Sequence, residues 1–300
     1  MAINRATLGR NMLAHLRSTH SKLQDLSARL SSGKKINTVS DDVAGASRVM
    51  RLRQNSSLLQ SRLQNARRGN TALGRAVSTL QQISDSLGRA RQLASQAANE
   101  TYDGSQRAAM AAEINSILEQ SVTAVADARG AGEYLFSGKK SQMSPYDVTR
   151  GPQERIQKVT YRGASVPARA SIGGNETVQM NFVAPRMVNR SGELFETLAD
   201  LRDAVRNGNQ AAIDKGIGRL KEAARGLRTS LSTLGARKRQ LQNYQEFLRS
   251  AADQNEKLIS REQDTDFARA AMKYRQQLTA LKSVLKLATR RSRISLANYI

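Results

Sequence analysis

Two adjacent carboxylates, Asp41 and Asp42, are the residues of this sequence whose types and spacing come nearest to acid–base chemistry. General acid–base catalysis needs a base, acid or nucleophile within hydrogen-bond reach, and no such partner recurs nearby in the sequence. A turn followed by a helix start accounts for the pair more simply, because an Asp side chain accepts the free N–H groups of a first helical turn. We therefore expect Asp41 and Asp42 to shape a turn, with Asp42 or Ser40 as the cap of a helix that begins near residue 43.

Metal and phosphate chemistry are not indicated either. The two histidines, His15 and His20, are five residues apart and do not share a helical face well, and the chain has no Cys. The pair Gly173-Gly174 is followed by neither Lys-Ser/Thr nor a helix start, so it predicts a turn and not a phosphate loop. The sequence therefore predicts no catalytic residue, no cofactor and no metal site, and the chain is not expected to be an enzyme.

The charge is strongly positive, at +23 over 300 residues. The excess is spread along the chain, with basic runs at Arg67-Arg68, Arg237-Lys238-Arg239 and Arg290-Arg291. Such a charge attracts polyanions nonspecifically, but the aromatic residues that would stack on bases are missing around these runs. We expect no specific nucleic-acid partner, although a basic coiled-coil nucleic-acid binder remains an alternative.

Composition favours a helical core without disulfides. Aromatic residues make up only 4% of the chain and Trp is absent, so Leu, Ile, Val and Ala must supply the buried surface. The four prolines all lie in the middle of the chain, which leaves two long flanks free of the strongest helix breaker. The N-terminus has no apolar run long enough for a signal peptide or a membrane span, so we expect no membrane insertion.

Two strict heptad ladders lie in opposite halves of the chain. A seven-residue repeat keeps one face of a long helix apolar and favours a coiled coil. The sequence therefore predicts a mainly α fold, with a long antiparallel helical coiled-coil rod built from both chain halves and a small β-rich domain inserted at its tip. The ladders are Leu52, Leu59, Ala66, Leu73, Leu80, Leu87 and Ala94, and then Ile213, Leu220, Leu227, Leu234, Leu241 and Leu248.

The pass along the chain predicts five segments. Residues 1–42 form an N-terminal helix and a joint, residues 43–132 an outgoing helical rod, and residues 191–262 the returning rod. Residues 133–190 hold all four prolines and short alternating stretches at 158–161 and 176–183, which predict a small β-rich domain. Residues 263–300 form a joint and a C-terminal helix, and this helix and the N-terminal helix together make up an axial core.

The two terminal helices are amphipathic and short, and such helices are marginal alone in water. We expect them to be poorly ordered until sister molecules cover their apolar seams. The predicted assembly interface contains Met12, Leu16, Leu23, Leu26, Leu30, Gly33, Ile36, Asn37, Asp41, Asp42, Asp266, Phe267, Tyr274, Leu278, Leu281, Leu285, Leu296, Tyr299 and Ile300.

Both joints carry a family resemblance. The stretch LSSGKKINTVSDDVAG at residues 30–45 resembles the N-terminal signature of bacterial flagellins and their junction relatives, and DTDFA at 264–268 resembles the matching C-terminal signature. The family commonly has Pro after the paired Asp, where this chain has Val43.

Within that superfamily, three features resemble the branch that joins hook to filament: GEYLFSG at 132–138, the C-terminus SLANYI, and the small middle domain. A filament-forming flagellin remains the alternative. Tyr134, Phe136 and Gly138 lie in the first of these features. They are possible partner contacts at the rod tip, and core packing is an equally open interpretation.

The resemblance implies a structural protein of the bacterial flagellum, outside the cell at the hook–filament junction. It implies export without a cleaved signal peptide and assembly into a ring. The implied partners are copies of the same chain, the hook-side junction protein, flagellin, the flagellar export apparatus and a chaperone.

Overall fold

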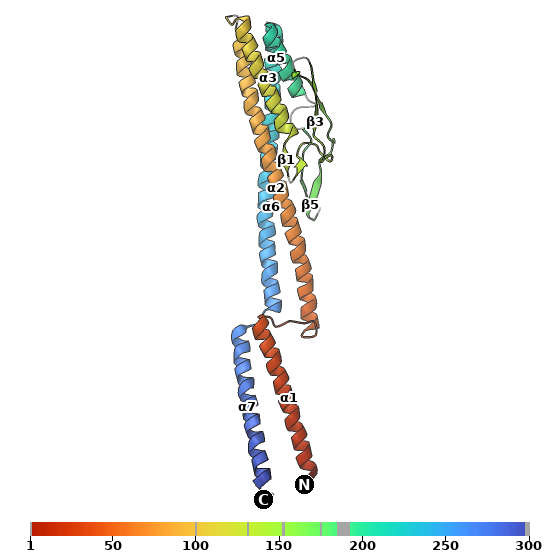
Figure 1. The fold of residues 1–300 in the computed structure, drawn as a ribbon, viewed down its shortest axis with the longest axis vertical. Helices are drawn as coiled ribbons and strands as arrows, with labels where there is room; N and C mark the ends of the chain where they lie inside the picture. The colour runs from red at the N-terminus through yellow and green to blue at the C-terminus, as the bar shows by residue number, and fades with distance from the viewer. Residues whose placement is uncertain are drawn as a thin grey trace. The chain divides into compact units, whose positions relative to one another are not determined.

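The computed structural model describes residues 2–99, 101–130, 132–151, 154–174, 176–184 and 193–297, and the side chains from residue 10 to residue 286 within these ranges. The chain divides into two compact units, which we describe separately (Figure 1). One unit consists of Met1–Leu58 with Ala251–Ile300, and the other is Leu59–Ser250. We call them the terminal unit and the central unit.

Helices α2 (Val43–Ala97) and α6 (Gln210–Gln263) carry the two heptad ladders. Their central-unit rungs are buried, from Leu59 to Ala94 on α2 and from Ile213 to Leu248 on α6. A seven-residue repeat drifts only slightly around an α-helix, so each ladder stays on the face that meets its neighbours. The mainly helical fold built from both chain halves is thus confirmed.

The two helices run antiparallel. Within the terminal unit, Arg48 Nη2 lies 3.0 Å from Glu262 Oε2, and the Asn55 side-chain amide donates to Asn255 Oδ1 at 3.0 Å. Asn255 in turn donates to the carbonyl of Leu52 at 2.8 Å and is only 4% exposed. The buried Asn255 in an apolar seam favours one register, because any slip would leave its side-chain amide without these partners.

Helices α3 (Gly104–Ala126) and α5 (Glu193–Asn207) pack together in the central unit. A capping box starts α3, since the Asp103 carboxylate accepts from Gln106 N and the Gln106 side chain accepts from Asp103 N. The packed faces are apolar and contain Ala111, Ile114, Leu118, Val122 and Val125 on α3, and Leu194, Leu198, Leu201 and Val205 on α5.

Three antiparallel hairpins follow α3 in the described residues. They pair β1 (Arg129–Gly130) with β2 (Glu133–Tyr134), β3 (Tyr146–Arg150) with β4 (Ile156–Tyr161), and β5 (Arg169–Gly173) with β6 (Glu176–Gln179). The two stretches predicted as strands are found as β4 and β6, although β6 ends four residues earlier than predicted. Gly173 and Gly174 have φ of +140° and +54°, which confirms the turn between β5 and β6.

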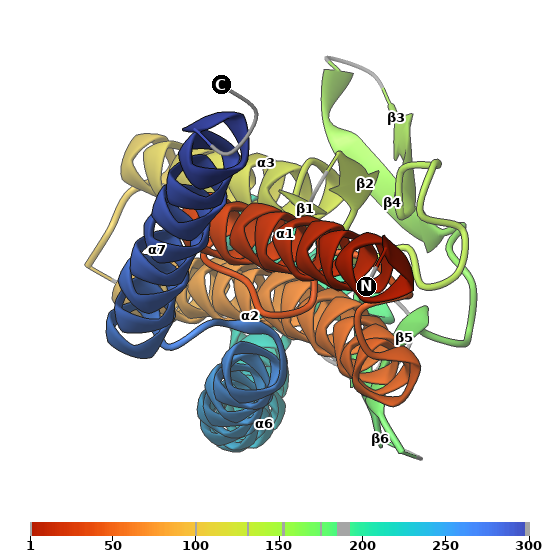
Figure 2. The ribbon, with the colours of Figure 1, turned by 90° about the horizontal axis from the view of Figure 1, so that it is seen from below.

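The β-rich insertion lies along the side of α2 and α6 in the central unit, and not at the tip as we predicted (Figures 1 and 2). Asn65 donates to the carbonyl of Ser171, and Val178 packs on Gly69. A Cβ at position 69 would lie 2.4 Å from Val178 Cγ2. Gly69 is thus the place where the hairpin approaches helix α2, because only a residue without a Cβ leaves room for Val178.

The few aromatic side chains are concentrated around this insertion. The rings of Phe136 and Phe182 are 6.4 Å apart between centroids, and Tyr146 contacts both Tyr161, at 5.6 Å, and Phe195 of α5, at 5.3 Å. The central unit therefore has two kinds of core: aliphatic seams between its helices and an aromatic cluster between the β-rich insertion and α5.

Arg202 of α5 links three elements. It is 3% exposed, and its Nη1 donates to Ile156 O of β4 and to Asn115 Oδ1 of α3, both at 2.9 Å. Its Nε and Nη2 bind the adjacent Asp203 carboxylate, also at 2.9 Å. The guanidinium supplies several donors in one plane, which is why an arginine can serve three elements at once.

We predict that Arg202→Ala lowers the free energy of unfolding of the central unit by about 3 kcal/mol, because it leaves a cavity and a buried carbonyl without its donor. Arg219→Ala is the matched control. Its ion pair with Asp200 at 2.9 Å is solvent-exposed, and such pairs contribute about 0–1 kcal/mol. Urea denaturation followed by circular dichroism measures both, and equal losses would contradict the role given to Arg202.

Candidate assembly surface and its joint

The two joints found in the sequence meet in the terminal unit. The Lys35 amide donates to Gln263 O at 2.7 Å, the Thr265 amide donates to Gly33 O at 2.9 Å, and Lys34 and Asp264 form an antiparallel bridge. Gly33 has φ of +70°, a conformation that glycine adopts without strain. We call residues 33–42 together with 261–266 the joint clasp. It joins α1 (Ala2–Ser32) and α7 (Phe267–Ala297) to α2 and α6 through backbone hydrogen bonds.

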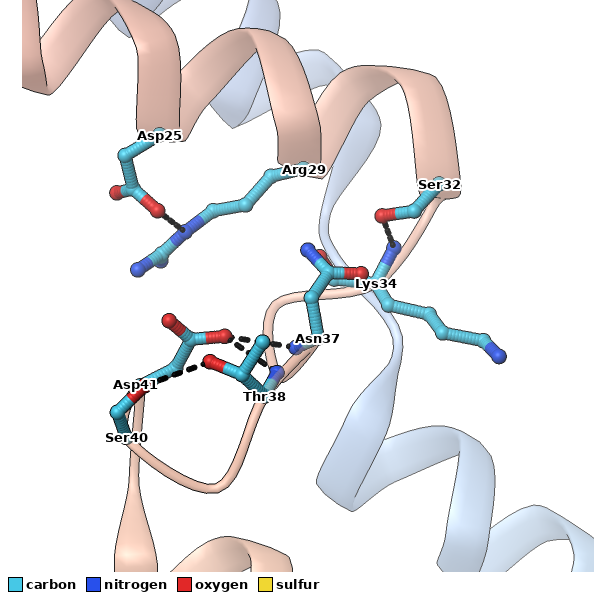
Figure 3. Close-up of polar contacts among 8 residues, drawn as sticks. All are labelled: Asp25, Arg29, Ser32, Lys34, Asn37, Thr38, Ser40 and Asp41. Carbon is cyan, nitrogen blue, oxygen red and sulfur yellow. Dashed lines mark hydrogen bonds and ion pairs between the residues drawn. The ribbon is translucent and has the colours of Figure 1, made fainter.

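Asp41 holds the first loop of the clasp in shape (Figure 3). One carboxylate oxygen accepts the amides of Asn37, at 2.9 Å, and Thr38, at 2.8 Å. Beside it, the hydroxyls of Thr38 and Ser40 are 2.8 Å apart. Backbone donors that stabilise the ionised carboxylate lower the pKa of Asp41, and the charge of Arg29 contributes a smaller effect in the same direction.

Asp42 and Asp266 are helix caps. Asp42 Oδ1 accepts from Gly45 N at 2.8 Å at the start of α2, and Asp266 Oδ1 accepts from Arg269 N at 3.0 Å at the start of α7. Gly45 itself is a residue that sequence analysis did not single out. A Cβ there would lie 2.4 Å from Asp42 Oδ2 and 2.6 Å from Ile36 Cδ1, so a glycine allows the buried Ile36 to close over the helix start.

The pKa shift of Asp41 predicts an acid-sensitive loop. Its folded-state pKa lies below its ordinary value of 3.8, so the carboxylate contributes stability above that pH, and this contribution is lost as the pH falls through the lowered pKa. Amide chemical shifts of Asn37 and Thr38 should therefore titrate together below pH 3.8, and no such transition should occur in Asp41→Asn. A midpoint above 3.8 would contradict the assigned hydrogen bonds.

Helices α1 and α7 pair side by side within the terminal unit (Figure 1). Among the predicted interface residues whose side chains are described, only Leu23 and Ile36 are buried, while Phe267 and Leu285 are exposed, as are the polar Asn37, Asp41, Asp42 and Asp266. Leu296 lies in α7 with its side chain outside the described residues, and Tyr299 and Ile300 lie outside them altogether. The half-buried members are Met12, Leu16, Leu26, Leu30, Gly33, Tyr274, Leu278 and Leu281.

Further apolar side chains are exposed in this unit that heptad counting missed. Leu13 on α1 and Met272 on α7 are 50% and 65% exposed, in addition to Phe267, which is 61% exposed. Leu13 directly follows the predicted seam residue Met12, so this apolar residue could have been found by looking beside the seam. Around the clasp and the start of α2 the exposed apolar residues are Val39, Val43 and Met50.

The residues proposed as tip contacts belong to the β-rich insertion. Phe136 is fully buried against Phe182, which fits core packing and not docking. Gly138 is also buried and has φ of +58°. Tyr134 is half-buried, and its hydroxyl accepts from Arg129 Nη2 at 2.7 Å.

The structure also places the groups that the sequence offers for acid–base or metal chemistry. The paired aspartates cap and shape loops, and His15 and His20 are both exposed on α1. Among the described residues no group of three His, Cys, Asp or Glu side chains could hold a metal ion. Within the same residues, none of the helices has the length and apolar character needed to cross a membrane.

Comparison with known proteins finds relatives with flagellar names. Residues 3–141 match the family described as the bacterial flagellin N-terminal helical region. The chain is 24% identical over 255 residues to flagellar hook-associated protein 3 of Salmonella typhimurium, covering 78% of this chain and 77% of that one. It is 25% identical over 226 residues to a flagellin of Listeria innocua, covering 73% and 78%.

Among solved structures, a flagellar hook-associated protein of Vibrio parahaemolyticus has the same fold, with a TM-score of 0.66, 17% identity, and coverage of 74% of this chain and 99% of that one. Over residues 3–141 the chain therefore resembles the flagellin superfamily. Its sequence and its fold are similar to those of hook-associated protein 3 and of a hook-associated protein, respectively. The prediction of a structural protein of the flagellum that is not an enzyme is confirmed by these relatives.

Proposed function

We propose that the chain assembles as a ring at the hook–filament junction, through helices α1 and α7. The observation that carries this proposal is the incomplete burial of the α1–α7 pair. Most seam residues of the pair are half-buried, and Leu13, Phe267, Met272 and Leu285 are exposed. Two helices can cover only one face of each other, so the remaining apolar side chains require neighbours.

The burial still to be gained is large enough to drive assembly. Each large apolar side chain that moves from exposed to fully buried contributes about 1.5–3 kcal/mol. Four exposed side chains on one helix pair therefore represent several kcal/mol per subunit before the cost of ordering is subtracted. A ring of identical chains would repeat this contact at every interface, which suits a structural element that must be closed and stable.

The clasp gives this assembly its geometry. Backbone hydrogen bonds across Gly33–Thr265 and Lys35–Gln263 fix where the terminal helices leave α2 and α6. Domain boundaries at 42 and 263 are part of the proposal, with residues 1–42 and 263–300 forming the axial core. The neighbours of the ring are proposed to be the hook-side junction protein and flagellin, after export by the flagellar export apparatus with a chaperone.

Electron microscopy locates the protein most simply. Cells that carry an epitope-tagged chain are labelled with immunogold, and the label is counted along each flagellum. We expect a single band where hook and filament meet. Label distributed along the whole filament would overturn the junction assignment.

A filament-forming flagellin is the second candidate, because the Listeria innocua flagellin matches the chain over most of its length. A flagellin elongates from filament seeds without other subunits, whereas a junction ring does not. Purified chain added to sheared filament seeds should therefore produce no growth. Long filaments made of this chain alone would favour the flagellin assignment instead.

A further inference from the structure

A groove in the central unit lies between hairpin β5–β6 and helix α6. Its cavity volume is about 560 Å³. All four residues of β6 form one wall and α6 forms the other, while Leu73 of α2 and Leu241 contribute apolar surface between them. Figure 2 shows β6 and α6 on the same side of α2. Among the described residues β6 pairs only with β5.

Two aromatic residues of α6 line the groove, and one of them is held in place while the other is exposed. The hydroxyl of Tyr244 donates to Ile172 O at 3.0 Å, so this ring is held against the hairpin. The ring of Phe247, one helical turn further along α6, lies 5.9 Å from that of Tyr244 and is 63% exposed. An exposed phenyl ring beside an apolar hollow is a typical anchor for an apolar side chain of a partner.

The charge around the groove is one-sided. Arg169 of β5 and Arg237 of α6 line it, and Arg237 Nη1 donates to Gln179 Oε1 at 3.0 Å, which bridges the two walls. Glu176 is the acidic residue of the lining. The adjoining helix segments 59–84 and 223–245 contain no Asp or Glu, and their cations are Arg62, Arg67, Arg68, Arg75, Arg225, Arg228, Arg237, Lys238 and Arg239.

We propose that this groove binds an acidic segment of another protein, whose apolar side chain covers Phe247 and whose carboxylates bind Arg169 and Arg237. The charge identifies the occupant, since a segment that enters this basic field must carry negative charge to gain rather than lose energy on approach. A second copy of a chain with a net charge of +23 fits poorly. A nucleic acid would use the cations but would not need an apolar hollow of this size. The inference is independent of the ring assembly proposed above.

The test uses a defined probe, the fluorescein-labelled peptide EELFDELE, with anisotropy measured against the full-length chain at about 0.15 M salt. Two variants address the groove: Phe247→Ser, and Arg169→Gln combined with Arg237→Gln. The matched control, Arg225→Gln combined with Arg228→Gln, removes the same charge from exposed positions of α6 outside the lining. Circular dichroism checks that all variants stay folded, and the substituted side chains are exposed, so folding should be unaffected.

We expect saturable binding that weakens about tenfold or more in each groove variant and less than about twofold in the control. The peptide EESSDESE, which keeps the charge and lacks the apolar residues, should bind at least about tenfold more weakly. The proposal is overturned if EELFDELE does not bind, if the control loses as much as the groove variants, or if EESSDESE binds equally. It is also overturned if single-stranded DNA binds as tightly and Phe247→Ser leaves that binding unchanged.

Discussion

A chain that lacks residues 267–300 should be exported but should form no junction, and cells that carry only this chain should have hooks without filaments. Removing α7 removes the partner of α1, so the half-buried side chains of α1 lose the cover that they have, and the interface offered to neighbouring copies disappears. The expected loss of assembly is complete. Electron microscopy of cells and immunoblotting of the medium together separate failed assembly from failed export.

A finer variant keeps α7 and removes only the exposed apolar side chains, Phe267→Ser with Met272→Ser. Both residues are more than 60% exposed, so the subunit should stay folded while assembly weakens. Arg269→Ser with Arg275→Ser is the matched control on exposed positions of the same helix. Normal filaments in the double apolar variant would show that these side chains do not form the subunit contact.

Gly138→Ala should lower the free energy of unfolding of the central unit by about 3 kcal/mol or more, because Gly138 lies at a crowded position of the β-rich insertion. Gly138 has φ of +58°, and an added Cβ would lie 2.5 Å from Ala164 O and 2.7 Å from Val166 O. Left-handed backbone costs a residue with a Cβ about 1–2 kcal/mol, and the contacts with two backbone oxygens add to it. The backbone cannot yield easily, because Gly138 N donates to Phe182 O at 2.9 Å and Gly138 O accepts from Asn181.

Gly132→Ala provides the control for that substitution. Gly132 has φ of +88° and nothing within 4 Å of an added Cβ, so it should show the conformational cost alone. Urea denaturation followed by tyrosine fluorescence reports on the insertion, since Tyr146 and Tyr161 lie in its core and the chain has no Trp. If both variants lose the same free energy of unfolding, the crowding at Gly138 is not real.

The sequence predicted the helical framework because a heptad repeat is a direct consequence of helix geometry. Leu73, Leu80, Leu220 and Leu227 are all buried as the ladders required, and the cap at Asp42 follows from the preference for Asp just before a first helical turn. These are local rules, and they need no knowledge of what lies across the interface.

The position of the insertion could not be predicted in the same way. It depends on Gly69 meeting Val178, which are far apart in the sequence, and an isolated glycine in a helical pattern gives no sign of its partner. The joint clasp is similar. Each loop was recognised by resemblance, but the backbone hydrogen bond between Lys35 and Gln263 involves no side-chain pattern. Leu13 and Met272 were missed because counting along one seam ignores apolar residues beside it.

Hydrogen exchange on the dilute subunit and on the assembled junction tests the central claim most directly. The claim is that α1 and α7 reach full burial only between copies of the chain. Amides in residues 10–32 and 267–286 should exchange at least about 100-fold faster than those of α3 and α5 in the dilute subunit, and should become protected on assembly. Equal protection of the terminal helices and of α3 and α5 in the dilute subunit would contradict it.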